Sequence, residues 1–407
     1  MRDLGVFGAA ILLASVGLLG ALLSAKLSSR FSIPAPAVFL IVAALASDLF
    51  PSLNVSILTV ERIATVALVV ILFDGGASIG LQRFRAAAGP IAALGIVGTF
   101  VTAGAMAVFA HWTLGVDWTI AALLGAAVAP TDPAVMFSVF GGHEVSGRTG
   151  TILEGESGAN DPVGIALVIG IVELATHADA TPWIVVREFS IQMAVGLAVG
   201  ALGGVGMGML LKRLTLPSSG LYTLRTLAGA GIVYGVATVA HGSGFLAVFI
   251  AGLAVGDLRV PFRAEIEIFQ DALSSLAEIV VFVALGLTIA ISDIGATHWG
   301  QGLLLAAVLA LVVRPVVAGL LLLPAQLRHG ERAFIAWGGL KGAVPILLAS
   351  FAVQQHVHDA HLVYELVFIV VLASVVVQGG TMRPAARRFG VHFEPTPASS
   401  VGVTSPM

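Results

Sequence analysis

Long apolar segments alternate with short polar ones along the whole of this 407-residue chain. Most of these segments are close to the roughly 20 residues that a helix needs to cross the hydrocarbon core of a bilayer. The pattern predicts thirteen membrane-spanning helices, near residues 5–24, 34–49, 59–80, 87–110, 117–140, 151–175, 186–211, 221–240, 243–256, 266–291, 302–323, 332–352 and 362–382. We therefore expect an all-α polytopic membrane protein with a transmembrane domain over residues 1–388.

Two of the predicted spans are interrupted by helix-breaking residues together with a charged side chain. The fifth span has a proline on each side of Thr131–Asp132, and the twelfth has Lys341 within a glycine-rich run. Proline removes a backbone donor, and glycine tolerates unwound backbone. Each break falls in the fifth helix of a block of six, and the two blocks (about 5–175 and 221–382) begin on opposite sides of the membrane. This pattern predicts an inverted repeat, in which interrupted helices indicate the substrate site of a transporter.

The basic residues predict the orientation of the spans. Most of the 20 Lys and Arg residues lie in every second loop, and an excess of basic residues is typical of cytoplasmic loops. These loops carry Lys26 and Arg30, Arg83 and Arg85, Arg148, Lys212 and Arg213, Arg259 and Arg263, Arg328 and Arg332, and finally Arg383, Arg387 and Arg388. We expect an external N-terminus, a cytoplasmic C-terminus and a place in the cell (inner) membrane. Residues 389–407 are expected to form a short, disordered cytoplasmic tail.

Composition narrows the possible functions. Hydrophobic residues make up 58% of the chain and charged residues only 11%, whereas about 25% of an average soluble domain is charged. The surroundings are therefore expected to be the lipid bilayer, and no nucleic-acid partner is expected. The chain has no cysteine, which excludes disulfides and thiolate metal sites. We expect neither a cofactor nor a resident metal.

Acidic residues lie inside two neighbouring predicted spans, where ionisable side chains are costly and mark ion or proton pathways. At 1.5 Å per residue, Asp161 lies roughly 15 Å from the start of the sixth span, near the bilayer midplane. Asp132 lies past the middle of the fifth span and can face Asp161. A hard monovalent cation needs several oxygen donors. Unwound backbone carbonyls and six side chains supply them: Asp161, Asp132, Thr131, Ser157, Glu156 and Asn160.

Burial favours the protonated form of a carboxyl group, so protons and cations are expected to compete for Asp161. A carboxylate that holds either a proton or a cation, but crosses the membrane empty only at high cost, produces obligatory exchange. The residues therefore predict a secondary transporter, not an enzyme, that exchanges Na⁺ or K⁺ for H⁺, with Na⁺ favoured.

Four motifs carry a resemblance to a known family, in the order that the family has them. They are Phe73-Asp74-Gly75-Gly76, Pro130-Thr131-Asp132-Pro133, Glu156-Ser157-Gly158-Ala159-Asn160-Asp161-Pro162 and Gly339-Leu340-Lys341-Gly342-Ala343-Val344-Pro345. The chain resembles the monovalent cation:proton antiporters, specifically their NhaP-like sodium (or potassium)/proton branch. The resemblance implies a homodimer whose dimerisation bundle is separate from a mobile core with crossed helices 5 and 12. It also implies that Asp161 is the exchanging carboxylate, assisted by Thr131, Asp132, Glu156 and Ser157.

The resemblance further implies that exchange is electroneutral, because Asn160 stands where electrogenic relatives have a second aspartate. Lys341 is a departure, since the family usually has arginine there to neutralise the glutamate at the position of Glu156. Lysine lacks the planar fork of arginine and can deprotonate when buried. We expect Lys341 to pair with Glu156. Arg314, another charged residue within a span, is expected to balance charge by pairing with an acid such as Glu278.

Three alternatives remain open from the sequence. A K⁺/H⁺ antiporter would use the same oxygen donors, because selectivity depends on cavity size and ligand distances. An ion channel would need a continuous pore lined by rings of carbonyls or charges, whereas this chain has one cluster near the midplane. An intramembrane protease would use Ser243, or Asp132 with Asp161, but an oxygen-rich unwound site favours cation binding.

Overall fold

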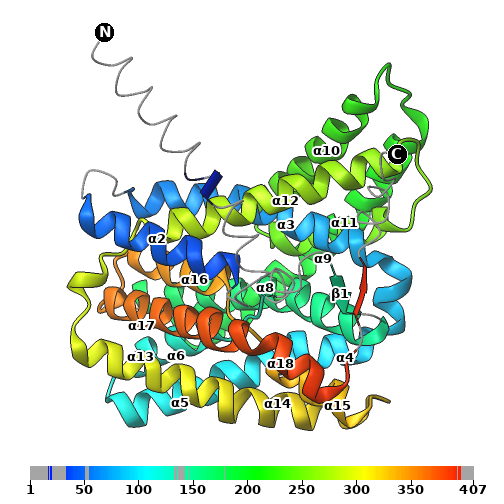
Figure 1. Cartoon of the computed structure of the whole chain (residues 1–407). Coiled ribbons are helices and arrows are strands. Elements are labelled where there is room, and N and C mark those ends of the chain that lie inside the picture. Colours follow the sequence, from blue (N-terminus) through cyan, green and yellow to red (C-terminus); the bar gives the residue numbers. More distant parts are fainter. Residues whose placement is uncertain are drawn as a thin grey trace.

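The computed structural model describes residues 34–50, 55–132, 147–177 and 179–391, together with 17, 19–20, 135, 143–145 and 393–395. Nearly all of these residues are helical (Figure 1). The predicted spans from the second to the thirteenth each correspond to a described helix or to a helix interrupted at its centre. Almost all of the first predicted span, and the second half of the fifth, lie outside the described residues.

The helices follow one another through the chain with short connections. In order they are α2 (Ala35–Leu49), α3 (Ile57–Ala86), α4 (Ala88–Ala92), η2 (Ala93–Gly98), α5 (Thr99–Leu114), α6 (Trp118–Val128), α8 (Gly147–Thr176), α9 (Trp183–Arg213), α10 (Ser219–Val239), α11 (Gly244–Gly256), α12 (Arg263–Gly286), η3 (Ile291–Asp293), α13 (Ala296–Val308), η4 (Leu309–Val313), α14 (Arg314–Leu321), α15 (His329–Trp337), α16 (Ala343–Gln354), α17 (Ala360–Ala373), η5 (Ser374–Gly379) and α18 (Gly380–Phe389).

By length and composition, seven continuous helices among the described residues can cross a membrane. Their lengths of 24 to 31 residues exceed the roughly 20 that a bilayer requires, and they are helical because a span in lipid must satisfy its backbone hydrogen bonds internally. Figure 1 shows α3, α10, α11 and α12 on one side of the molecule and α5, α13, α14 and α15 on the other, with α8 and α16 between them. The protein is thus the all-α polytopic membrane protein that the apolar pattern predicts.

Three of the long helices change from α-helical to π-helical geometry part of the way along. The π-helical segments are η2 between α4 and α5, η4 between α13 and α14, and η5 between α17 and α18. Such segments are uncommon and are frequent at functional sites. Two of them lie against the polar centre of the protein, because η2 packs on α8 and η4 ends immediately before Arg314.

The two interrupted helices meet at their breaks. The helix α6 ends at Val128 and is followed by non-helical residues up to Asp132, and the backbone between α15 and α16 is unwound over 338–342. The Asp132 N–H donates to the carbonyl oxygen of Leu340 at 2.8 Å. A Cβ atom on Gly342 would collide with the Asp132 carboxylate, so only glycine permits this approach. The crossing of helices 5 and 12 is therefore confirmed.

Elsewhere, small residues let helices pack closely. A Cβ atom on Gly252 of α11 would collide with the backbone of Phe73 in α3, and one on Gly76 would collide with Phe249 in α11. Close approach of this kind is how membrane helices associate without a hydrophobic driving force. It fixes α3 and α11 in one bundle, and α12 packs on α3 from the same side.

A short antiparallel pair differs from the expected disordered tail. Strand β2 (Phe393–Pro395) pairs with β1 (His143–Val145), and His143 lies opposite Pro395. This part of the tail is ordered because its backbone bonds to the segment before α8. The remainder of the tail after Pro395 lies outside the described residues.

Candidate cation site

The centre of the site is a group of polar side chains on α8. Glu156, Ser157, Asn160 and Asp161 are all buried, although the helix around them is otherwise apolar. Pro162 lies inside the helix and has no N–H, so it cannot bond to the carbonyl oxygen of Gly158. A single helix therefore presents carboxylate, hydroxyl, amide and carbonyl oxygens within one buried turn and a half.

The break after α6 is hydrogen-bonded directly to this group. Ser157 Oγ donates to the carbonyl oxygen of Thr131 at 2.5 Å, and Asn160 Nδ2 donates to Thr131 Oγ1 at 2.8 Å. The structure thus brings together Thr131, Ser157 and Asn160, as the sequence predicts. The Ser157 hydroxyl and the Asn160 amide both use their hydrogens for bonds within the cluster. Oxygen lone pairs of the cluster therefore remain available to bind a cation.

Two buried oxygen atoms of the cluster accept no hydrogen bond from the described residues. They are Oδ1 of Asn160 and Oδ1 of Asp161. Buried polar atoms are nearly always hydrogen-bonded, so unpaired acceptors need an explanation. A hard cation binds oxygen ligands, and a carboxyl oxygen can take a proton. The donor set of this site therefore fits an alkali cation or a proton as cargo.

Asp132 lies at the edge of the cluster, half-buried, beside the N-cap residue Gly342 of α16. The N-terminus of a helix carries partial positive charge and stabilises an anion. Asp132 is also close enough to Asp161 for their charges to interact. The site therefore contains two carboxylates, of which Asp161 is the more deeply buried.

Glu156 forms an ion pair with Arg314. We expected Glu156 to pair with Lys341, and Arg314 to pair with an acid such as Glu278, so both expectations were wrong. Arg314 Nη1 donates to Glu156 Oε1, and Nη2 donates to Oε2 at 2.9 Å. The two side chains are 5% and 1% exposed. The planar fork of Arg314 matches both oxygens of the carboxylate, and Lys341 does not contact Glu156 through any of its hydrogen bonds among the described residues. The same pairing leaves Glu278 without an arginine.

Lys341 instead binds backbone oxygens at the end of α6. Its Nζ donates to the carbonyl oxygens of Ala129 at 2.7 Å and Pro130 at 2.9 Å. The last carbonyls of a helix lack partners within it and carry partial negative charge, so a cation there is favourable. The Lys341 ammonium group, which lies in the break between α15 and α16, therefore binds the C-terminal end of α6.

Two polar residues near the second break were not identified from the sequence. Ser374 Oγ accepts from the Lys341 N–H at 2.9 Å and donates to Gln378 Oε1 at 2.7 Å. Both lie in η5, and both are buried. The available signal was the presence of these two polar residues within the otherwise apolar stretch 366–380 of the thirteenth span.

The remaining candidates do not form a second site. Ser243 is the N-cap of α11 and accepts from the Leu246 N–H at 3.2 Å, which explains this serine structurally. Among the described residues, no group of three or more His, Asp or Glu side chains could hold a metal ion, and His356, His358 and His361 form none.

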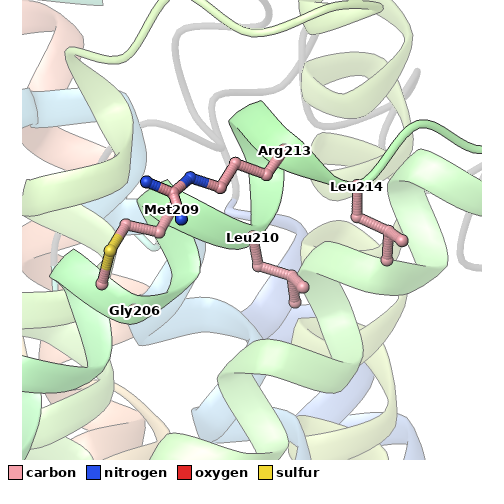
Figure 2. Close-up of a pocket in the computed structure, with 5 residues that line it drawn as sticks. All are labelled: Gly206, Met209, Leu210, Arg213 and Leu214. Carbon is pink, nitrogen blue, oxygen red and sulfur yellow. The ribbon is translucent and has the colours of Figure 1, made fainter.

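A separate surface pocket lies at the C-terminal end of α9. It has a volume of about 430 Å³ and is lined by Gly206, Met209, Leu210, Arg213 and Leu214 (Figure 2). Its one charged lining side chain is basic, and no carboxylate lines it. This pocket does not suit a cation.

Comparison with known proteins agrees with the fold and the motifs. The family described as sodium/hydrogen exchanger, transmembrane, matches residues 12–388. The K(+)/H(+) antiporter NhaP of Alkalimonas amylolytica is 37% identical over 385 residues, covering 93% of this chain and 66% of that protein. The K(+)/H(+) antiporter NhaP2 of Shewanella sp. (strain ANA-3) is 34% identical over 93% of this chain and 68% of the relative. The chain thus spans about two thirds of the length of these relatives.

A solved structure shows the same fold. The sodium proton antiporter MjNhaP1 from Methanocaldococcus jannaschii, at pH 8, matches with a TM-score of 0.76 and 23% sequence identity, covering 91% of this chain and 98% of that one. This chain belongs to the sodium/hydrogen exchanger family, a family of membrane transporters that exchange monovalent cations for protons, and not to a family of enzymes.

Proposed function

We propose that the protein exchanges a monovalent cation for a proton across the membrane at Asp161. The observation that carries this proposal is the pair of buried, unpartnered oxygens of Asn160 and Asp161, beside hydroxyl and amide groups that are hydrogen-bonded to one another. A site rich in oxygen acceptors binds either a proton or an alkali cation, and binding one excludes the other. A buried carboxylate crosses the membrane only when its charge is neutralised.

The ion pair between Glu156 and Arg314 supports one-for-one exchange. Because Arg314 neutralises Glu156, the charge that changes during the cycle is that of Asp161. The neighbouring Asn160 is an amide and cannot carry a proton. One cation therefore replaces one proton, and the exchange is electroneutral.

The identity of the cation is proposed from the relatives. Our first expectation was Na⁺, with K⁺ as the alternative, and the oxygen donors themselves do not separate the two cations. The relatives at 37% and 34% identity are named K(+)/H(+) antiporters, and the Na(+)/H(+) antiporter NhaH of Halobacillus dabanensis is 28% identical over 73% of this chain. These names support K⁺ as the first cation to test, followed by Na⁺.

The cellular setting is also proposed. We place the protein in the cell (inner) membrane, and the distribution of basic residues supports an external N-terminus, a cytoplasmic C-terminus and a cytoplasmic tail over residues 389–407. The resemblance to NhaP-like antiporters supports a homodimer. Chemical crosslinking in native membranes would test the dimer.

Exchange is tested in proteoliposomes with an acidic interior. Adding K⁺, Na⁺ or Li⁺ outside should make the interior more alkaline, and the Asp161→Ala variant should abolish the response. Glu265→Gln is the matched control, because Glu265 is an exposed carboxylate in the first turn of α12. A folded wild-type protein that responds to no cation would contradict the proposal and favour a channel.

A further inference from the structure

A buried polar pair in the thirteenth span has no role in the mechanism described so far. Ser374 and Gln378 are 4% and 5% exposed, and the other residues of the π-helical segment η5 are valine and glycine. A buried hydroxyl in a membrane helix commonly bonds to a carbonyl of its own helix, as Ser350 does with Leu347 at 2.7 Å. Ser374 Oγ donates instead to Gln378 Oε1, also at 2.7 Å. The pair therefore needs an explanation beyond its own helix.

Both side chains bind the unwound backbone between α15 and α16. Ser374 Oγ accepts from the Lys341 N–H at 2.9 Å, and Gln378 Nε2 donates to the carbonyl oxygen of Trp337 at 3.4 Å. Trp337 is the last residue of α15, and residues 338–342 are not helical, so these backbone groups lack a continuing helix to bond to. The pair thus replaces part of the missing helical hydrogen bonding and ties the break to η5.

The packing of the thirteenth span holds the pair in place. The helix α17, which leads into η5, packs on both α16 and α6. At the end of η5, a Cβ atom on Gly379 would collide with Pro34, the N-cap residue of α2, and would touch the Leu340 side chain at 3.4 Å. The segment η5 is therefore seated directly against the break, between α2 and the unwound backbone.

The break in turn positions the cation site through Lys341. The N–H of Lys341 is bound to Ser374, and its Nζ atom is bound to the carbonyl oxygens of Ala129 and Pro130. The next residue, Thr131, accepts the hydrogen bonds of the α8 side chains. Lys341 thus connects η5 to the backbone that supplies oxygen donors. A shift of the break would move these donors relative to α8.

We propose that Ser374 and Gln378 are positioning residues for the transported cation, which hold the break between α15 and α16 and so set the spacing of the oxygen donors around Asp161. This proposal rests on the proposed antiport function and adds residues that determine its cation selectivity. Na⁺ is smaller than K⁺, so a preference between them depends on how closely and how rigidly the donors are held. A looser break should weaken binding and reduce the difference between the two cations.

The test compares the apparent KM for K⁺ and for Na⁺ of Ser374→Ala, Gln378→Leu and wild-type protein in proteoliposomes. Each variant should raise the KM for the preferred cation roughly tenfold, the lower end of the loss typical when an outer-shell partner of a metal site is removed. The KM for the other cation should rise less, so the ratio of the two KM values should move toward one. The maximal rate should change little, because Asp161 itself is intact. Ser374→Thr, which keeps the hydroxyl, should restore part of the affinity.

Thr381→Val is the matched control from the helix that follows η5. Thr381 is exposed, and its Oγ1 atom accepts from the Trp337 side-chain Nε1 at 3.2 Å. The variant therefore removes a hydrogen bond to the same half-helix without altering a bond to the backbone of the break. Its KM values and their ratio should equal those of wild type. Size-exclusion chromatography shows which variants fold, and either Ser374→Ala or Gln378→Leu alone decides the question.

Three results would overturn the inference. The first is a folded variant whose KM values equal those of wild type, in which case a loss of thermal stability alone would make the pair purely structural. The second is a rise by the same factor for both cations, and the third is the same change in Thr381→Val. These outcomes differ from failure of the proposed function, in which wild-type protein itself exchanges no cation for protons.

Discussion

Arg314 and Glu156 lie within the membrane domain as a buried, two-pronged ion pair, in which each Nη atom of the arginine donates to one carboxylate oxygen. Arg314 Nη2 also donates to the carbonyl oxygen of Ile335 at 3.2 Å, at the end of the half-helix α15. One arginine thus neutralises an acid of α8 and binds the end of a broken helix. A Cβ atom on Gly339 would collide with its guanidinium group, so the break has a glycine there.

Removing one partner of this pair should destabilise the protein more than removing both. Glu156→Gln or Arg314→Gln alone leaves an unpaired buried charge, which typically costs about 3–5 kcal/mol. The double variant leaves neither charge unpaired, so it should lose less stability than either single variant. The loss of stability of each variant is measured by heating the protein in detergent and determining, by size-exclusion chromatography, how much folded protein remains at each temperature. Strict additivity would show that the two charges do not act as a pair.

Lys341→Arg should fold and should keep the one-for-one ratio of cation to proton. The Lys341 Nζ atom is bound to two backbone carbonyls, so its charge has a positional role that arginine can share. Lys341→Met should lower stability, because hydrogen bonds to a charged group contribute about 1.5–3 kcal/mol each. The ratio is measured from exchange at clamped membrane potential. A changed ratio in Lys341→Arg would instead identify Lys341 as a proton carrier.

Gly342→Ala should reduce transport at least tenfold while the protein still folds. The added methyl group would occupy the position of the Asp132 carboxylate and push it away from the crossing. Gly319→Ala is the matched control, because a Cβ atom there meets no other atom within 4 Å. Exchange rates in proteoliposomes and elution profiles of both variants provide the measurement. Wild-type transport by Gly342→Ala would show that the position of Asp132 is not critical.

Competition at Asp161 also predicts a specific pH dependence. On the acidic side, where the carboxyl group is protonated, the apparent KM for the cation should rise about tenfold per unit fall in pH, by mass action. The maximal rate at saturating cation should change much less. Initial rates at several cation concentrations and pH values test this. A KM independent of pH would place proton and cation at separate sites.

The spans and the breaks could be predicted because they depend on local sequence. Apolar runs of sufficient length define the helices, and the residues around Asp132 and Lys341 cannot continue a helix. Thr131, Ser157 and Asn160 were also identified, because each lies in a break or beside Asp161. In the structure, Ser157 and Asn160 each donate a hydrogen bond to Thr131.

The partner of Glu156 could not be predicted, because it depends on how distant helices pack. Arg314 and Lys341 are both buried cations far from Glu156 in the sequence, and their charges do not distinguish them. What distinguishes them is position: Arg314 follows the π-helical segment η4, and Lys341 lies against the end of α6. The apolar sequences of η2 and η4 carry no recognisable signal for π-helical geometry.

The central claim is that a proton and a cation exclude each other at Asp161, and cation-induced proton release from purified protein tests it most directly. Adding K⁺ or Na⁺ to the protein in weakly buffered detergent solution, at a pH where Asp161 is protonated, should release about one proton for each cation bound. The Asp161→Asn variant should release none. Cation binding without proton release, or undiminished release from Asp161→Asn, would contradict exchange by competition at this carboxylate.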